Sequence, residues 1–269
     1  ERLVRWHLES GTAGVVPMGT TGESATLNTH EHLEVISRTI EVANGRISVV
    51  AGTGSNSTEE TLHQTKEAES LGADACLLVT PYYNRPTQEG LYAHFKKVAE
   101  TTSVPLVLYN VPGRTGCDLL PETIGRLSSI EGIVGIKEAS GKIERVSEIR
   151  SVSASDFFIL SGEDALTLEM MNNGAVGTIS VTANVLPKAM AEFCDSFLSG
   201  NIKRASAIDE VLQSVHEILF IESNPTPAKW ALHQMGIIHE GIRMPLLPLS
   251  SRYRSELKKR IDEAMEALK

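Results

Sequence analysis

Short apolar segments alternate with helical patterns through the first two thirds of the chain, and this alternation excludes most folds. Between the apolar segments lie amphipathic patterns, several of which open on a Ser, Thr or Asn cap. Continuous apolar strands separated by helices predict an α/β protein whose parallel sheet is covered by helices. The predicted strands are 14–18, 47–51, 75–79, 106–109, 133–136, 157–160 and 176–181, and the predicted helices between them are 31–43, 58–71, 90–101, 121–127 and 165–172.

Two architectures satisfy this pattern, an open doubly wound sheet and a closed barrel. The length of 269 residues favours a (β/α)8 TIM barrel, which takes about 250 residues and eight strands. Because seven strands are predicted, we expect the first barrel strand to be absent from this chain and to precede Glu1. The opening residues read as the last turns of an amphipathic helix, which agrees with this interpretation.

The last third of the chain predicts helices alone, so we expect a C-terminal helical appendage. We divide the chain into a barrel over residues 1–200 and a helical region over residues 201–269. The segment Asn224-Pro225-Thr226-Pro227 is interpreted as a hinge and helix start, because proline is tolerated in a first turn. The helices predicted here are 187–198, 202–221, 226–235 and 250–268.

Composition excludes several classes of protein. A net charge of -9 and a pI near 5.4 argue against nucleic acid as a partner. No apolar run is long enough to cross a membrane, and no signal peptide is evident, so we expect a cytoplasmic protein. Three separated cysteines and eight scattered histidines predict no disulfide framework and no catalytic metal, and the glycine patterns predict no nucleotide.

Polar residues follow the apolar segments, at the strand ends where barrel enzymes carry their chemistry. The first group is Gly19-Thr20-Thr21-Gly22-Glu23-Ser24, whose N–H groups and hydroxyls suit a small anion such as a carboxylate. An ordinary βα turn with a capping hydroxyl explains this group equally well when it is taken alone.

The second group joins Tyr109, at a strand end, to Arg114 in the loop that follows. Arginine suits bidentate capture of a carboxylate, and tyrosine can transfer a proton. A packed tyrosine and a solvated surface arginine are the alternative interpretation.

The third group places Lys137 after an apolar run of period two, at the end of a buried strand. Burial there disfavours the charged ammonium and favours a neutral amine that attacks a ketone. The alternative is a structural lysine paired with Glu23 or Glu138.

Together with Tyr82-Tyr83-Asn84-Arg85-Pro86, these groups resemble the dihydrodipicolinate synthases, within the pyruvate-aldolase family that includes N-acetylneuraminate lyase. The resemblance covers nearly the whole chain. It implies a lyase of lysine and diaminopimelate biosynthesis that needs no cofactor. Its lysine forms a Schiff base with pyruvate, and the resulting enamine attacks L-aspartate 4-semialdehyde to give 4-hydroxy-tetrahydrodipicolinate.

The resemblance also implies a role for each site residue. Lys137 would form the imine and Tyr109 would transfer protons, with Thr20 and a neighbouring subunit's Tyr83 completing a proton relay. Thr20, Thr21 and their backbone would hold the pyruvate carboxylate, and Arg114 would hold that of the second substrate. Gly162 and Ile179 would line the pocket near Lys137.

The resemblance further implies a homotetramer built as a dimer of dimers, in which Tyr83 reaches a partner's site. In several synthases lysine inhibits at a dimer interface, and Thr29 here replaces a His found there in some members. The positions matching that L-lysine inhibitor site are Ser24, Ala25, His32, Asn56, Glu60 and Tyr82.

Two other functions stay open. A 2-keto-sugar-acid aldolase or lyase of the same family would use the same Lys137 imine, but such enzymes typically carry Ser-Thr in the first group and lack Arg114. An inactive truncated barrel is the other alternative, because a barrel without one strand exposes two sheet edges.

Overall fold

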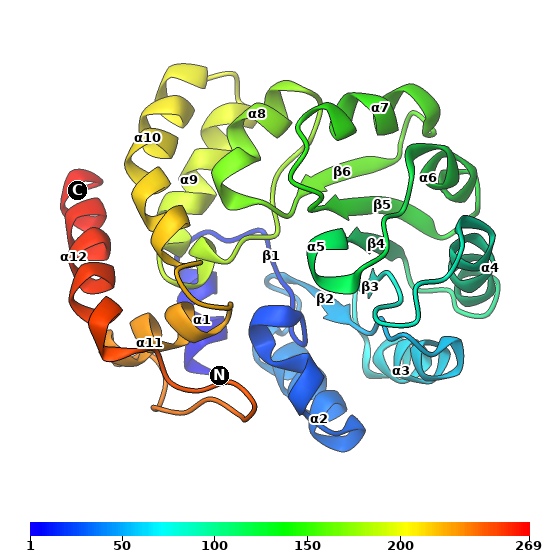
Figure 1. Cartoon of the computed structure of the whole chain (residues 1–269), viewed down its shortest axis with the longest axis horizontal. Helices are drawn as coiled ribbons and strands as arrows, with labels where there is room; N and C mark the ends of the chain where they lie inside the picture. Colours follow the sequence, from blue (N-terminus) through cyan, green and yellow to red (C-terminus); the bar gives the residue numbers. More distant parts are fainter.

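The computed structural model describes all 269 residues and contains one curled sheet of six parallel strands (Figure 1). The strands lie side by side in chain order, so each one pairs with the next. All six carboxyl ends therefore meet at one edge, and the predicted parallel α/β architecture is confirmed. The strands are β1 (Gly14–Val15), β2 (Ser48–Gly52), β3 (Ala75–Val79), β4 (Leu106–Asn110), β5 (Ile133–Glu138) and β6 (Phe158–Ser161).

The strands are apolar on both faces because the sheet packs on both sides. All five residues of β4 are buried. Leu106 and Leu108 belong to a large core beneath the surrounding helices, whereas Val107 and Tyr109 belong to a smaller cluster with Leu77 inside the curl. Burial on two faces produces the continuous apolar runs from which the strands were predicted.

Helices surround the sheet, and several of them begin at recognisable caps. Asn28 and Glu31 form a reciprocal capping box, with both hydrogen bonds at 3.0 Å, and Ser57 and Thr87 cap the next two helices. The helices are α1 (Arg2–Glu9), α2 (Thr29–Ala43), α3 (Thr58–Leu71), α4 (Gln88–Ala99), α5 (Pro112–Thr115), α6 (Pro121–Ser128), α7 (Glu144–Val152), α8 (Thr167–Asn172), α9 (Pro187–Leu198), α10 (Ile202–Ile218), α11 (Thr226–Gln234) and α12 (Ser251–Ala267).

Helix α7 was not predicted, because a charged residue occupies a core position. Arg145 is 4% exposed and pairs with Asp118, whose carboxylate lies 2.9 Å from its guanidinium. The buried arginine interrupts the apolar periodicity that Val146 and Ile149 would otherwise display.

The prediction of a regular strand over residues 176–181 is wrong. This segment instead forms an isolated parallel bridge, in which Thr178 is opposite Ser161 of β6. The N–H of Ser161 donates to Gly177 O at 2.8 Å, and the N–H of Ile179 donates to Ser161 O at 2.9 Å. Gly177 has φ +153°, outside the strand region, which interrupts regular pairing.

Strand β1 is also shorter than the predicted range of 14–18. Pro17 has no N–H to donate, and Met18 has φ +61°, so the strand ends at Val15. The chain nevertheless stays close to β2, since a Cβ on Gly52 would lie 2.3 Å from Met18 O. Glycine at position 52 is therefore required to seat the turn that follows β1.

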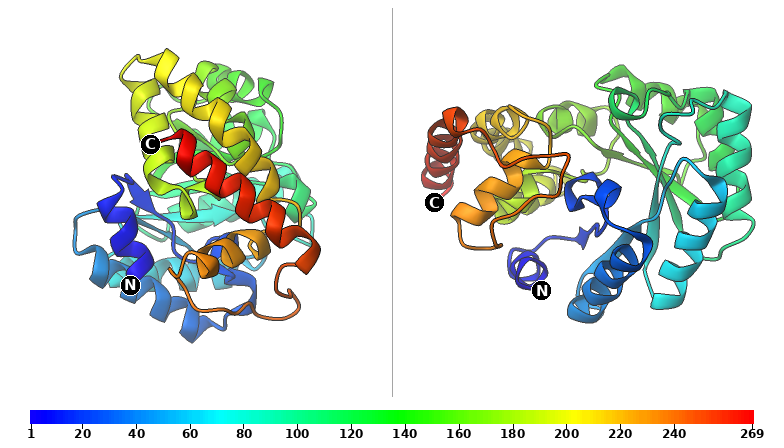
Figure 2. Two further views of the ribbon diagram at one scale, coloured as in Figure 1. Left: turned by 90° about the vertical axis from the view of Figure 1, so that its left-hand side faces the viewer. Right: turned by 60° about the horizontal axis from the view of Figure 1, so that its bottom comes forward.

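The C-terminal helical part is confirmed, and it packs against helices of the preceding region, α10 lying against α8 and α9, rather than standing apart. Helix α12 lies against α10 (Figure 2), and both contribute to the large core that also holds strand residues such as Leu78. None of the helices combines the length and the apolarity that crossing a lipid bilayer requires.

Acidification is expected to destabilise the fold through buried histidines. Burial lowers the pKa of His94 to about 4, and its Nε2 has no hydrogen-bond partner. Between about pH 6.5 and about 4, His94 is protonated in the unfolded chain but not in the folded one. The free energy of unfolding therefore decreases as the pH is lowered through this range, by up to about 3 kcal/mol. Urea unfolding at several pH values measures this loss. His94→Gln should lessen it, and an unchanged pH dependence in that variant would contradict the assignment.

Candidate active site

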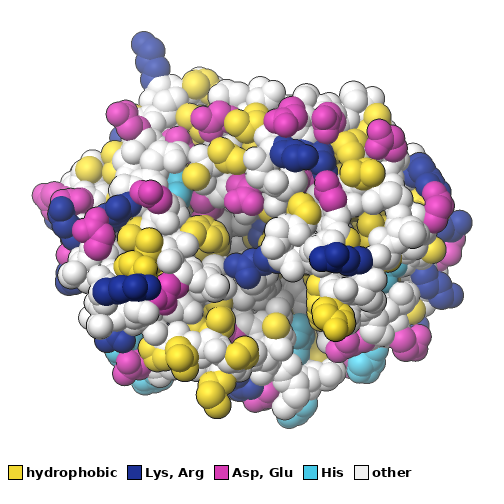
Figure 3. All heavy atoms as spheres, viewed as in Figure 1, with side chains coloured by type: hydrophobic (Ala, Val, Ile, Leu, Met, Phe, Trp, Pro, Cys, Tyr) yellow, Lys and Arg dark blue, Asp and Glu magenta, His cyan; other side chains and the backbone are white.

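A cavity of about 560 Å³ opens at the carboxyl ends of the strands. In the space-filling view the molecule is hollowed near its centre, over these strand ends (Figure 3). Turns after several strands, residues 178–184 and the C-terminal region all contribute to its walls. The predicted site residues that line it are Thr20, Thr21, Tyr109, Arg114, Lys137, Gly162 and Ile179.

Lys137 and Tyr109 occupy opposed positions on neighbouring strands. Tyr109 of β4 pairs in register with Lys137 of β5, and the lysine Nζ lies 4.3 Å from the centroid of the tyrosine ring. Successive residues of a strand point to opposite faces of the sheet. Ile136 and Glu138, on either side of Lys137, are fully buried on the outer face, so the Lys137 side chain points inward, as does that of its partner Tyr109. The site thus places an amine beside a phenol.

Gly162 leaves the space that the lysine side chain fills. A Cβ at this position would lie 2.9 Å from Lys137 Cε and 2.7 Å from Ala139 Cβ. The Gly162 N–H also donates to Glu138 O at 2.8 Å, which fixes the end of β6 against β5. A larger residue at 162 would therefore displace Lys137.

A buried polar network lies directly behind the two reactive side chains. Asn110, which follows Tyr109, donates to Glu138 at 3.1 Å and to Asp118 at 2.8 Å. Glu138, which follows Lys137, also accepts the Ser140 N–H at 2.6 Å. Burial raises the pKa of Glu138 despite these hydrogen bonds. The network ties the ends of β4 and β5 together, and with them Tyr109 and Lys137.

Arg145 holds this network from the outer side. Its guanidinium donates to both oxygens of Asp118, at 2.9 and 3.0 Å. Although burial acts to raise it, the pKa of Asp118 is lowered because Arg145 and Asn110 hydrogen-bond to the carboxylate. Asp118 therefore stays ionised as the anchor of the network.

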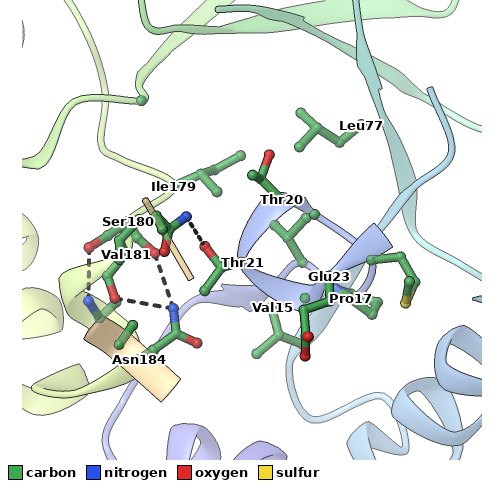
Figure 4. A pocket seen from close by; sticks show the side chains of 18 of the residues that line it. Val15, Pro17, Thr20, Thr21, Glu23, Leu77, Ile179, Ser180, Val181 and Asn184 are labelled. Carbon is green, nitrogen blue, oxygen red and sulfur yellow. Dashed lines mark hydrogen bonds between the residues drawn. The ribbon is translucent and has the colours of Figure 1, made fainter. Parts of the chain in front are cut away.

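The predicted anion turn forms the opposite wall of the cavity. Residues Thr20–Gly22 make one 3-10 turn, closed by the Gly22 N–H on Gly19 O at 3.0 Å. Figure 4 shows the Thr20 and Thr21 side chains beside Ile179 and Ser180. The turn thus presents two hydroxyls to the cavity, as the sequence predicts.

Glu23 binds the end of this turn to the C-terminal region. Its carboxylate forms an ion pair with Lys229 and accepts the Arg243 N–H at 2.8 Å. The suggested alternative pairing of Lys137 with Glu23 is not found, because Glu23 is engaged by Lys229. Lys137 also makes no ion pair with Glu138, whose oxygens bind Asn110 and Ser140.

Arg114 reaches the cavity from α5, and its Nη2 donates to Asn224 O at 3.4 Å. Glu163, which was not predicted, also lines the cavity. Burial, and then the charge of Asp164, raise the pKa of Glu163, while Lys137 and Arg114 act to lower it. Its position just after the end of β6 was the available signal. Other cavity residues that were missed are Ser180, Asn224 and Lys229.

Tyr83 does not reach this cavity. Its side chain is 90% exposed, and its backbone has φ +74°, held by its N–H on Thr115 O at 3.2 Å. Within one chain the structure therefore does not bring Tyr83 to Thr20 or Tyr109.

The six positions predicted for lysine inhibition lie outside the cavity as well. His32 is buried, and its Nε2 lies 2.7 Å from Gly52 O. Burial lowers the pKa of His32, although the hydrogen bond to Gly52 and the charge of Glu60 act to raise it. Glu60 accepts the Ser55 hydroxyl at 2.6 Å, and Asn56 O accepts Asn84 Nδ2 at 2.8 Å. Tyr82 is 41% exposed, and Ser24 and Ala25 start the short turn before α2.

Comparisons with known proteins match this chain to one family over nearly its whole length. Residues 1–264 match the model of the Dihydrodipicolinate synthetase family. A protein of Methylococcus capsulatus named 4-hydroxy-tetrahydrodipicolinate synthase is 55% identical over 263 residues, which cover 98% of this chain and 90% of that protein.

Solved structures of dihydrodipicolinate synthases superpose closely on this chain. The chloride-inhibited dihydrodipicolinate synthase of Acinetobacter baumannii, complexed with pyruvate, superposes with a TM-score of 0.96 at 51% identity, over 98% of this chain and 90% of that one. The enzyme of Cyanidioschyzon merolae with lysine bound gives a TM-score of 0.94 at 37% identity, over 98% and 90% of the two chains.

Proposed function

Because the chain belongs to the dihydrodipicolinate synthetase family, we propose that its cavity residues carry out that family's reaction in the roles given below. The reaction is the lyase step of lysine biosynthesis that condenses pyruvate with L-aspartate 4-semialdehyde to give 4-hydroxy-tetrahydrodipicolinate. The observation that supports these roles best is that Lys137 Nζ lies 4.3 Å from the Tyr109 ring centroid, in a cavity that Thr20, Thr21 and Arg114 also line.

In the first half of the reaction the lone pair of Lys137 Nζ attacks C2 of pyruvate. The carbonyl oxygen takes up protons and leaves as water, giving a protonated imine. This cation withdraws electrons from the methyl group, so loss of a methyl proton yields the enamine. We assign the proton transfers to Tyr109, and the pyruvate carboxylate to the hydroxyls and N–H groups of Thr20 and Thr21.

In the second half the enamine carbon attacks the aldehyde carbon of aspartate semialdehyde, and the new alkoxide is protonated. The substrate's own amine then adds to the imine carbon and displaces Lys137, which closes the ring and restores the enzyme. Arg114 holds the carboxylate of this second substrate. Gly162 and Ile179 shape the wall beside Lys137.

Imine trapping tests this proposal directly. The protein is incubated with pyruvate and borohydride, which reduces an imine to a stable amine, and its intact mass is then measured. We expect one reduced pyruvyl group per chain, located on Lys137 by peptide mapping. A folded protein with no adduct, or with the adduct on another lysine, would contradict the proposal.

Tyr109→Phe is expected to lower kcat by roughly 100-fold, because general acid–base catalysis contributes about 10² to 10⁴. The ring packing against Lys137 is retained in this variant, so the melting temperature should change little. Steady-state kinetics with both substrates measure the effect. A kcat within threefold of wild type would show that another group transfers the protons.

We propose that the chain works as a homotetramer, a dimer of dimers in which Tyr83 of one subunit completes the relay with Thr20 and Tyr109 of its partner. The support is that Tyr83, a large aromatic residue, is 90% exposed and has a backbone φ of +74°. Within one chain it does not reach Thr20 and Tyr109, so the relay is incomplete without a partner. Analytical ultracentrifugation with activity measurements tests it: a fully active monomer would refute the role of Tyr83.

Inhibition by L-lysine at Ser24, Ala25, His32, Asn56, Glu60 and Tyr82 also stays a proposal. Its support is the resemblance of these positions to the family's inhibitor site and the C. merolae enzyme, which was solved with lysine bound. Initial rates in millimolar lysine decide it, and unchanged rates would end it.

The finer description of the fold is proposed on similar grounds. It consists of a (β/α)8 barrel over residues 1–200 and a helical region over residues 201–269. The curled sheet supports this division, because its two outermost segments, β1 and residues 176–179, each pair with a neighbouring strand on one side only. A strand between those two segments would close the barrel. A cytoplasmic location is likewise inferred from the biosynthetic reaction.

A further inference from the structure

We propose that Asn224, in the C-terminal helical region, is a positioning residue for substrate binding: it sets the direction in which the Thr21 hydroxyl donates. This inference rests on the proposed function, in which Thr21 holds the carboxylate of pyruvate. It concerns a residue about 200 positions away from Thr21 in sequence, on the segment that enters α11.

Asn224 contacts two of the residues to which we assign carboxylate binding, one for each substrate. Its side-chain Nδ2 donates to Thr21 Oγ1 at 2.9 Å, the hydrogen bond drawn to Thr21 in Figure 4. Its backbone carbonyl accepts the Arg114 guanidinium at 3.4 Å. Asn224 is 5% exposed and contributes to the cavity wall.

The hydrogen bond to Thr21 has a direction, and the direction matters for binding an anion. A threonine hydroxyl has one proton to donate and two lone pairs that accept. When Oγ1 accepts the amide N–H of Asn224, its own proton remains available for another acceptor. A carboxylate in the cavity is such an acceptor, so Asn224 prepares Thr21 to act as a donor.

Stability alone does not explain the Asn224 side chain. Its Oδ1 is buried and has no hydrogen-bond partner, and an unsatisfied buried acceptor is destabilising. The side chain therefore makes one hydrogen bond, to Thr21, while its second polar atom is left unpaired. This arrangement is typical of a residue retained for its effect on a site.

The two contacts of Asn224 separate the two substrates. Arg114 binds the backbone carbonyl, which any residue at position 224 would keep, whereas Thr21 binds the side chain. Removing the side chain should therefore weaken the binding of pyruvate more than that of aspartate semialdehyde.

The test compares Asn224→Ala with wild type and with Asn184→Ala. Asn184 is a matched control, because its amide also lies in the cavity wall but donates to the backbone carbonyls of Ser180 and Val181 alone. For Asn224→Ala we expect KM for pyruvate to rise about tenfold, the size of one hydrogen bond of about 1.4 kcal/mol, with KM for the aldehyde and kcat each within about twofold. Asn184→Ala should retain the wild-type KM for pyruvate.

A double-mutant cycle with Thr21→Val shows whether Asn224 acts through Thr21. If it does, Asn224→Ala added to Thr21→Val should raise KM for pyruvate no further. Asn224→Asp gives an independent measurement from a side chain of nearly the same shape, should the alanine variant fail to fold. Because aspartate only accepts, the Thr21 proton turns toward it, and KM for pyruvate should rise more than in the alanine variant.

Several results would overturn the proposal. They are an unchanged KM for pyruvate in a folded Asn224 variant, equal rises in both KM values, or additive effects in the cycle. Wild-type protein that forms no pyruvate imine would overturn the proposed function itself, together with this inference. If the wild-type protein is active and KM for pyruvate is unchanged in a folded Asn224 variant, this inference alone is overturned.

Discussion

Lys137→Ala is expected to lower kcat/KM by roughly four orders of magnitude and to abolish the borohydride-trapped pyruvate adduct, because the imine nitrogen itself is removed. The loss should be chemical rather than structural. Ala fits in the space that Gly162 and Ala139 leave for the lysine stem, and no hydrogen bond or ion pair of Lys137 is lost. Intact mass and steady-state rates, with a melting curve, measure these effects separately.

Lys229→Ala is the matched control for that experiment. Lys229 also lines the cavity, but it pairs with Glu23 at the end of the threonine turn. This variant should still form the pyruvate adduct. An adduct that survives in Lys137→Ala and disappears in Lys229→Ala would reassign the nucleophile.

Arg114→Ala is expected to lower kcat/KM for aspartate semialdehyde by roughly 100-fold while the pyruvate imine still forms. A charged hydrogen bond to a carboxylate stabilises a complex by about 1.5 to 3 kcal/mol, which corresponds to a factor of ten to above 100. The partial reaction with pyruvate is spared because Arg114 is assigned to the second carboxylate alone. Steady-state kinetics and imine trapping on the same variant measure the two halves.

The control for Arg114 is Arg85→Ala. The Arg85 guanidinium packs over Gly116, two residues beyond Arg114, but does not line the cavity. Its removal should leave kcat/KM for aspartate semialdehyde near the wild-type value. If Arg114→Ala were equally indifferent, the assignment of the second carboxylate to Arg114 would be wrong, and sugar-derived 2-keto acids should then be assayed as substrates.

The sequence was sufficient where a local pattern determines the structure. Strands β3 to β5 were predicted to within two residues at either end, because burial on two faces makes them continuously apolar. Lys137 and Tyr109 were recognised because each ends such a strand. Parallel pairing then brings strand ends to one edge, so residues of different strands meet there without further information.

Other features depend on contacts that no local pattern records. Helix α7 was missed because Arg145 occupies a core position, and its partner Asp118 is 27 residues away. The strand predicted at 176–181 contains the apolar residues of a strand but is interrupted by the backbone of Gly177. In both cases the composition of the segment was read correctly and its surroundings decided the structure.

Asn224 illustrates the same limit at the site. In sequence it stands in an Asn-Pro-Thr-Pro segment, which was interpreted as a hinge and helix start, and nothing nearby suggests a substrate. Its hydrogen bond to Thr21 spans 203 residues. Such long-range contacts follow from how the C-terminal helices pack. They cannot be predicted from the pairing of neighbouring strands.

The ion pair of Glu23 with Lys229 and the hydrogen bond of Asn224 with Thr21 have a consequence for how such proteins diversify. These two contacts join the threonine turn to the α11 segment, so a change on one side is expected to require a matching change on the other. A chimaera that exchanges residues 201–269 between relatives would separate the two sides of these contacts. Recombination at that boundary is therefore expected to disturb the carboxylate-binding turn, and mutations on either side are expected to compensate one another.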